Sequence, residues 1–167
     1  MSDAPTIDDP RKPGGGQDRP GVIARPPLIY LTFLAAGLGL DYGWPAPFMA
    51  DAARYPLGGA LAALGVALAV LSFRRFRGAG TNVQTWKPST ALVIEGPFRF
   101  SRNPIYVALT LIYCAIGVAA DSGWVLVLVV PLLAVMRYGV IAAEERYLEA
   151  KFGDAYRHYK GRVGRWL

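Results

Sequence analysis

The stretch YPLGGALAALGVALAVLSF, residues 55–73, decides the fold because its 19 residues include no charge. A helix needs about 20 predominantly apolar residues to cross a bilayer core of roughly 30 Å. Three similar stretches flank it: 26–50, interrupted by Asp41; 103–120, which is uncharged; and 122–143, interrupted by Arg137. The sequence therefore predicts an all-α integral membrane protein with about four spans. We expect them at 27–44, 56–73, 104–120 and 124–143.

Composition supports a membrane protein over a soluble one. Hydrophobic residues make up 53% of the chain and charged residues 18%, whereas an average soluble domain has about 25% charged residues. The alternative is a soluble helical bundle with an unusually apolar core. The length of the uncharged stretches favours the membrane.

The placement of lysine and arginine predicts an orientation. With both termini in the cytoplasm, the inner segments hold 17 of the 18 basic residues, and only Arg54 lies outside. Basic residues accumulate in cytoplasmic loops of membrane proteins. We therefore expect a multi-pass protein with both termini cytoplasmic, in the inner (plasma) membrane of a bacterium. The net charge of +6 then reflects attraction to anionic lipids, and no nucleic-acid partner is needed.

Two terminal regions differ from the apolar centre. Residues 1–25 are rich in Pro, Gly and Asp and predict a disordered cytoplasmic tail, which leaves 26–167 as the membrane domain. Near the other end, apolar and aromatic residues recur at steps of three and four, which predicts an amphipathic helix at about 144–163, interrupted at Gly153. The residues on this face are Leu148, Phe152, Tyr156, Tyr159 and Val163.

Small residues four apart follow the second expected span, as in Gly58 with Ala62 and Gly65 with Ala69. Small residues at this spacing let helices approach closely in lipid. We expect this face to pack on a neighbouring span, and a homodimer through it is possible.

A first polar group stands at the mouth of the third expected span: Arg102, Asn103, Pro104 and Tyr106. Asn before Pro is a good helix start, and a helix N-terminus stabilises anions. An anionic ligand group is one interpretation. A capped helix start with an arginine that binds lipid phosphate is the other.

A second polar group, Glu144 and Glu145, follows the fourth expected span. Adjacent carboxylates at an anionic membrane surface need cationic partners, which are either the nearby arginines (Arg99, Arg102, Arg146) or a bound organic cation. Aromatic faces attract cations, and three tyrosines follow: Tyr147, Tyr156 and Tyr159. A surface network of salt bridges is the alternative interpretation.

Other ionisable residues give weaker signals. Arg137 interrupts a span and is either functional or close enough to the cytoplasm for its side chain to reach the interface. His158, the single histidine, is on the polar side of its helix. We see no set of metal ligands and expect no metal.

Taken in order, the two groups resemble signatures of one family. Gly96-Pro97-Phe98-Arg99 … Arg102-Asn103-Pro104-Ile105-Tyr106 resembles G-P-Y-R … R-H-P-x-Y. Glu144-Glu145-x-x-Leu148 … Phe152-Gly153-x-x-Tyr156-x-x-Tyr159 … Val163-x-Arg165-Trp166 resembles E-E-x-x-L … F-G-x-x-Y-x-x-Y and its continuation. These signatures mark the isoprenylcysteine carboxyl methyltransferase and phospholipid methyltransferase superfamily. The resemblance covers roughly residues 80–167.

The resemblance implies an S-adenosylmethionine-dependent membrane methyltransferase. Its cofactor pocket would face the cytoplasm, and a lipophilic small molecule or lipid would reach it from the bilayer. Arg102, Glu144 and Glu145 would be catalytic. The cofactor would be bound by Arg102, Asn103, Pro104, Tyr106, Glu144, Glu145, Tyr156 and Tyr159. Arg102 or the adjacent helix N-terminus would hold the methionine carboxylate, and a glutamate the ribose hydroxyls or the amino group.

Asn103 departs from the family pattern, which most often has histidine there. Asparagine still forms hydrogen bonds but is no base at neutral pH. Methyl transfer to a carboxylate or thiolate needs little base, because positioning supplies much of the rate. Transfer to a protonated amine would need Glu144 or Glu145 as the base.

Two other functions remain open at this stage. Nicotinamide-dependent sterol reductases resemble this architecture but are longer. A non-catalytic membrane scaffold is the third possibility.

Overall fold

The computed structural model describes residues 20–80 and 89–167, and this part of the chain is all helical, without strands. The predicted tail falls largely outside it. The helices are α1 (Pro26–Gly43), α2 (Asp51–Gly78), the 3-10 helix η1 (Gly96–Arg99), α3 (Pro104–Ala119), α4 (Gly123–Val127), α5 (Val129–Val135), the π-helical turn η2 (Met136–Ile141) and α6 (Ala142–Arg162).

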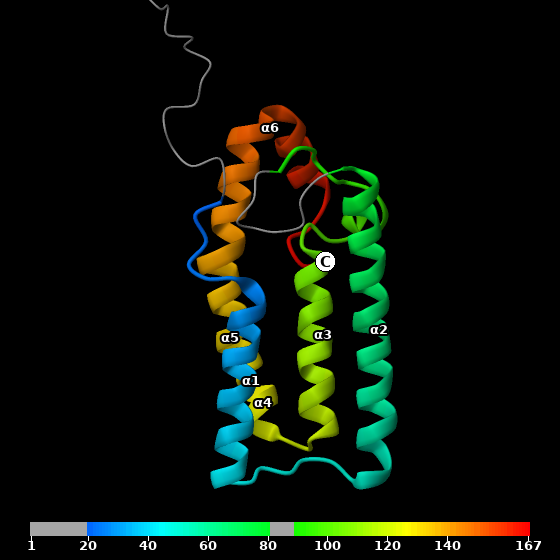
Figure 1. Cartoon of the computed structure of the whole chain (residues 1–167), viewed down its shortest axis with the longest axis vertical. Coiled ribbons are helices and arrows are strands. Elements are labelled where there is room, and N and C mark those ends of the chain that lie inside the picture. Colours follow the sequence, from blue (N-terminus) through cyan, green and yellow to red (C-terminus); the bar gives the residue numbers. More distant parts are fainter. Residues whose placement is uncertain (1–19, 81–88) are drawn as a thin grey trace, which may run out of the picture.

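The long helices lie side by side along one axis (Figure 1). In this view α3 lies between α1 and α2, and the chain turns at the lower end between α1 and α2 and again after α3. The most extensive packing is between α2 and α3, while α1 packs mainly against α4. The first and last described residues are therefore both towards the upper end.

Glycines explain the close approach of α2 to α3. A Cβ atom on Gly58 would lie 3.1 Å from the carbonyl oxygen of Ala115, and one on Gly65 would lie 3.0 Å from that of Ala108. Gly59 has open space instead. The expected packing of the small-residue face on a neighbouring helix is thus confirmed for Gly58 and Gly65.

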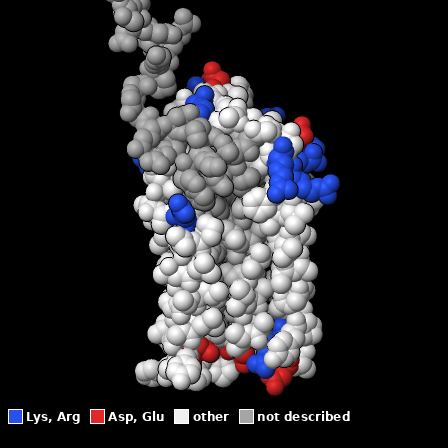
Figure 2. Space-filling view, viewed as in Figure 1, with Lys and Arg blue, Asp and Glu red and all other residues white. Residues whose placement is uncertain are grey.

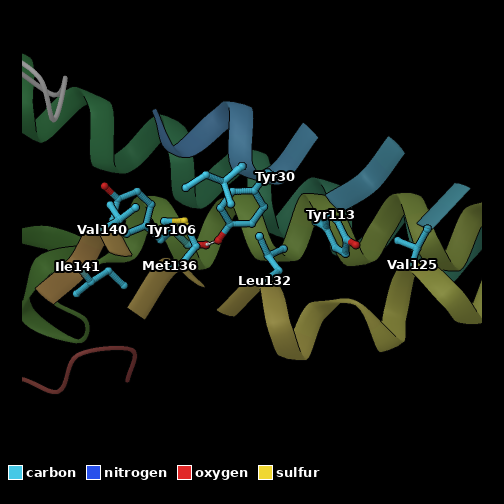
Figure 3. Close-up of a cluster of buried hydrophobic side chains, with 9 residues drawn as sticks. Tyr30, Tyr106, Tyr113, Val125, Leu132, Met136, Val140 and Ile141 are labelled. Carbon is cyan, nitrogen blue, oxygen red and sulfur yellow. Dashed lines mark hydrogen bonds between the residues drawn. The ribbon is translucent and has the colours of Figure 1, made fainter. Parts of the chain in front are cut away.

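A buried cluster joins α1, α3 and the helices from α4 onward (Figure 3). The hydroxyl group of Tyr30 in α1 donates to the carbonyl oxygen of Tyr106 in α3 at 3.1 Å and lies 2.8 Å from the hydroxyl of Thr110. Leu132 and Met136 are completely buried beside them. This cluster fixes the first turns of α3, where the first polar group lies.

The surface around the bundle is apolar where a soluble protein would be charged. Two helices are long and apolar enough to cross a membrane: α2, and the continuous run Gly123–Arg162 formed by α4, α5, η2 and α6. Only 17% and 28% of their most apolar windows are buried, so they are not the core helices of a soluble bundle. Figure 2 shows the uncharged band between two charged ends. The chain is a membrane protein.

α2 is longer than the sequence predicts, whereas the helical run after α3 covers the two helices expected at 124–143 and 144–163. α2 begins at Asp51 rather than near 56, with Pro56 inside it, where the missing N–H costs one hydrogen bond close to the helix start. Up to the bend at Gly153, the run that begins at Gly123 measures about 45 Å at 1.5 Å per residue, which is longer than a bilayer core of roughly 30 Å. Its polar part, α6, therefore extends beyond the membrane.

Gly153 bends α6. Its backbone has φ 53° and ψ −125°, outside the helical region, in a conformation that glycine adopts easily. Figure 1 shows the helix turning at the upper end of the molecule so that its last part comes back towards the start of α3. This bend brings Tyr156 and Tyr159 to the same place as Arg102.

Candidate functional site

A cavity of about 510 Å³ lies where α3 begins and α6 bends back, a volume in the range of small-molecule sites. All eight residues that the resemblance implied for cofactor binding line it: Arg102, Asn103, Pro104, Tyr106, Glu144, Glu145, Tyr156 and Tyr159. Its other walls are mainly apolar and come from α2, α3 and residues 91–93. The cavity thus has a polar wall on α3 and α6 and an apolar wall facing α2.

Glu145 is held between two arginines. Its Oε1 accepts from Arg102 Nη1 at 2.9 Å and from Arg165 Nε at 2.8 Å, and its Oε2 accepts from Arg165 Nη2 at 2.7 Å. Burial by itself would raise the pKa of Glu145, but the hydrogen bond from Arg165 and the charge of Arg102 lower it. The same hydrogen bond raises the pKa of Arg165. This triad ties α3, α6 and the C-terminal segment together.

Arg102 keeps one donor unused. Its side chain is only 9% exposed, and its second contact is Nη1 with the hydroxyl oxygen of Tyr156 at 3.4 Å. Its Nε is buried without a hydrogen-bond partner among the described residues. A buried donor without an acceptor is costly. Arg102 nevertheless lines the cavity, and a guanidinium group pairs well with carboxylates and phosphates, so Arg102 is suited to an anionic group of a ligand there.

Glu144 has a different environment from its neighbour. Its Oε1 accepts a hydrogen bond of 2.5 Å from the hydroxyl group of buried Tyr106. Burial raises the pKa of Glu144 to about 7; the hydrogen bond from Tyr106 acts in the opposite direction, and the charge of Glu145 adds to the increase. Glu144 can therefore gain or lose a proton near neutral pH, whereas Glu145 stays ionised.

Asn103 does not cap α3 as the sequence predicted. It occupies the N-cap position, but its side chain makes no capping hydrogen bond. Its Nδ2 instead donates to the carbonyl oxygen of Arg165 at 2.9 Å. The backbone N–H of Arg102 donates to the carbonyl oxygen of Gly164 at 3.0 Å. Because the C-terminal segment packs on the start of α3, the side-chain amide of Asn103 bonds to that segment and not to the first turn of α3.

Arg165 is the residue that sequence reasoning did not assign to the site. The signal for it was its position in the C-terminal part of the motif, Val163-x-Arg165-Trp166. Spacing alone gave no reason to bring it back to Glu145, 20 residues earlier. The bend at Gly153 is what makes this contact possible.

Tyr156 and Tyr159 line the side of the cavity that α6 forms. Both are buried, and their rings meet edge to face with centroids 6.2 Å apart. The hydroxyl of Tyr159 donates to the carbonyl oxygen of Phe98 at 2.7 Å, which fixes η1 against α6.

Several other candidates lie outside this arrangement. Arg137 and His158 are exposed and do not line the cavity. The guanidinium of Arg137 lies over the ring of Tyr138, 5.5 Å from its centroid. Arg146 donates to the carbonyl oxygen of Ala142, so of the three arginines considered for the glutamates, Arg102 is the one paired with Glu145.

Comparisons with known proteins bear on the same region. A family model described as "Phospholipid methyltransferase" matches residues 53–155, which include most of α2, all of α3 and both glutamates. An uncharacterised protein of Haemophilus influenzae is 42% identical over 65 residues, which are 38% of this chain and 100% of that protein. No solved structure matches.

Proposed function

The chain belongs to the phospholipid methyltransferase family, and from this membership we propose that it transfers a methyl group from S-adenosylmethionine to a lipophilic or lipid-linked acceptor at the cytoplasmic membrane face. One observation carries the proposal. Seven polar and aromatic residues and one proline from two distant segments line one cavity whose remaining walls are largely apolar. The family favours methyl transfer over the nicotinamide-dependent reduction considered above.

The polar wall fits the functional groups of this cofactor. Arg102, which lines the cavity, would hold the methionine carboxylate, because a guanidinium pairs well with carboxylates. Glu145 is fully engaged by Arg102 and Arg165 and would position Arg102. Glu144 would then bind the amino group, the ribose hydroxyls or the positively charged sulfonium of S-adenosylmethionine. Tyr156 would close the pocket. The cofactor supplies an activated methyl group when bound.

The same geometry divides the proposed catalytic roles. Arg102 would orient the cofactor, and Glu144, hydrogen-bonded to Tyr106, would accept a proton if the acceptor carries one. Asn103 would serve by holding the C-terminal segment rather than by proton transfer. A histidine N–H in this place could make the same hydrogen bond, so the substitution does not argue against activity.

The apolar wall fits an acceptor that arrives from the bilayer. It includes Ala69 and Phe73 of α2, Leu109 of α3 and Pro27 of α1. We infer that the acceptor enters between α1 and α2, since both helices contribute apolar residues to this wall. A lipid chain between these helices would bring its polar end to the cavity. The acceptor group would be a carboxylate, a thiol or an amine.

We further propose a single membrane domain, residues 26–167, with four spans and both termini cytoplasmic, in a bacterial inner membrane. Two features support this proposal. Successive long helices run in alternating directions (Figure 1), and basic residues gather at the end of the molecule that carries the cavity (Figure 2). The open position Gly59 leaves a face of α2 for a homodimer.

Transfer of a labelled methyl group tests the reaction. Protein in bacterial lipid would be incubated with S-adenosylmethionine labelled in its methyl group, and the organic phase would be counted. We expect label in the lipid fraction with the wild-type protein and no label with Glu144→Gln. Glu149→Gln, a control at a partly exposed position of the same helix, should retain the label. Release of volatile methanol by alkali would identify a carboxylate acceptor, and stable label an amine or a thiol. Label confined to the aqueous phase in every lipid tried, with cofactor bound, would contradict a lipophilic acceptor.

A further inference from the structure

A second hollow, of about 680 Å³, lies on the other side of η1 from the cavity. Tyr159 lines both, and η1 forms the wall between them, with Phe98 on one side and Arg99 on the other. The groove is open to the surface at the end of α2. Nothing in the proposed methyl transfer uses it.

Three arginines from three separate elements converge on this groove: Arg75 of α2, Arg99 of η1 and Arg162 of α6. One acid, Glu95, lines it as well, and its Oε2 is 3.7 Å from Arg75 Nη1. Within residues 20–80 and 89–167, neither Arg99 nor Arg162 has an ion-pair partner. The groove therefore carries two positive charges that no acid offsets.

The groove is shaped by specific packing and not only by mobile surface charges. Gly96 has φ +62°, and a Cβ atom there would lie 2.8 Å from Arg75 Nε. The absence of a side chain on Gly96 lets Arg75 lie against η1. On the opposite wall, the hydrogen bond from Tyr159 to Phe98 holds η1 in place.

Two large apolar side chains also line the groove and face outward. Phe100 is 73% exposed and Ile94 41% exposed. Exposed aromatic residues at the end of a spanning helix are typical of the interface between lipid and water. Figure 2 shows basic side chains gathered at this end of α2, directly above the uncharged band.

We propose that this groove binds the phosphate group of an anionic membrane phospholipid, with Arg75, Arg99 and Arg162 around the phosphate and Phe100 and Ile94 against the acyl region. Guanidinium groups pair with phosphate through two parallel hydrogen bonds. The apolar rim selects a lipid headgroup over a free phosphate ion. A merely diffuse attraction of basic residues to the membrane would depend on total charge and not on these positions.

The test is lipid binding in detergent, followed by native mass spectrometry. The probes are a short-chain phosphatidylglycerol, a short-chain phosphatidylcholine and inorganic phosphate. The variants are Arg99→Gln with Arg162→Gln, compared with Arg157→Gln with Arg146→Gln, which removes the same charge from exposed positions of α6 outside the groove. Thermal unfolding checks that each variant is folded.

We expect one phosphatidylglycerol to bind per chain, about tenfold or more weakly after the groove arginines are replaced and unchanged in the matched pair. Equal loss in both pairs would show diffuse attraction and overturn the site. Saturation by inorganic phosphate as tight as by the lipid would overturn the lipid assignment. S-adenosylmethionine binding is measured on the same samples, so failure of the proposed enzyme would show separately.

Discussion

At the scale of single residues, Glu144 and Glu145 are neighbours with opposite properties. Glu145 accepts from two guanidinium groups and is kept ionised, while Glu144 accepts from the Tyr106 hydroxyl and has its pKa raised to about 7. The difference arises because successive helical residues point about 100° apart, so one faces the C-terminal segment and the other faces α3. Adjacent identical side chains are thereby suited to different tasks.

Replacing Glu145 tests the triad. Glu145→Gln removes the charge that pairs with Arg102, whose side chain is 9% exposed, and leaving a buried charge unpaired costs about 3 kcal/mol. We expect a clear fall in the free energy of unfolding. Glu149→Gln, which alters partly exposed ion pairs with Lys160 and Arg157, should change it by less than about 1 kcal/mol. Similar losses of unfolding free energy in both variants would show that the triad of Glu145, Arg102 and Arg165 stabilises the fold no more than a partly exposed ion pair does.

Glu144 should make stability depend on pH. Its pKa in the folded protein, about 7, is above the ordinary value of 4.5, so between these values the folded state keeps a proton that the unfolded state has lost. Stability therefore falls as pH rises from about 4.5 to 7 and then levels off. Glu144→Gln should remove this part of the profile in thermal unfolding scans, and Glu149→Gln should retain it. An unchanged profile in Glu144→Gln would refute the assignment.

At this scale the motifs predicted eight of the residues that line the cavity. One group stands at the start of the third expected span and the other follows the fourth, which places both groups at the same end of the molecule. Arg165 was missed as a site residue and Asn103 was expected to act as a cap. Both errors have one origin: the C-terminal segment returns to the start of α3, and no local pattern specifies a contact that depends on a bend at Gly153.

At the scale of elements, the tight pairing of α2 with α3 depends on glycine. Gly65→Ala would bring a Cβ atom to 2.8 Å from Ile112 Cγ1 and 3.0 Å from the backbone oxygen of Ala108. Because backbone atoms cannot easily move aside, we expect a loss of about 1–3 kcal/mol in stability. Gly59→Ala is the matched control, since that position is open. Equal thermal stability of the two variants would contradict this packing.

The bend in α6 gives a second prediction for an element. Gly153→Ala forces a side chain into φ 53°, which costs about 1–3 kcal/mol, although no atom lies within 4 Å of the new Cβ. We expect lower stability and weaker cofactor binding, since the bend places Tyr156 and Tyr159 over the cavity. Gly161→Ala, in the same helix with open space and no positive φ, should retain both properties. Unaltered binding by Gly153→Ala would contradict a role for the bend.

The elements were predicted in type but not in length. Uncharged stretches identify apolar helices, yet they do not show where a helix continues into polar sequence. α2 extends through Arg74, Arg75 and Arg77 to Gly78, past the end of its uncharged stretch. The polar helix α6 was predicted instead from the three- and four-residue spacing of its apolar residues.

At the scale of the whole molecule, the distribution of charge gives the orientation. We propose that the end with the cavity faces the cytoplasm. In a Cys114→Ala background, Leu167→Cys at the C-terminus and Ala50→Cys at the opposite end, both exposed, should react differently with a membrane-impermeant maleimide. With intact cells, we expect Ala50→Cys to be labelled and Leu167→Cys only after the membrane is opened. The reverse pattern would contradict the orientation.

The central claim is that the cavity between α3 and α6 binds S-adenosylmethionine, and calorimetry on detergent-purified protein tests it most directly. We predict one site per chain for S-adenosylmethionine and for S-adenosylhomocysteine. S-adenosylmethionine should bind about tenfold more weakly to folded Glu144→Gln and normally to Glu149→Gln. Failure of folded wild-type protein to bind either compound would contradict the account.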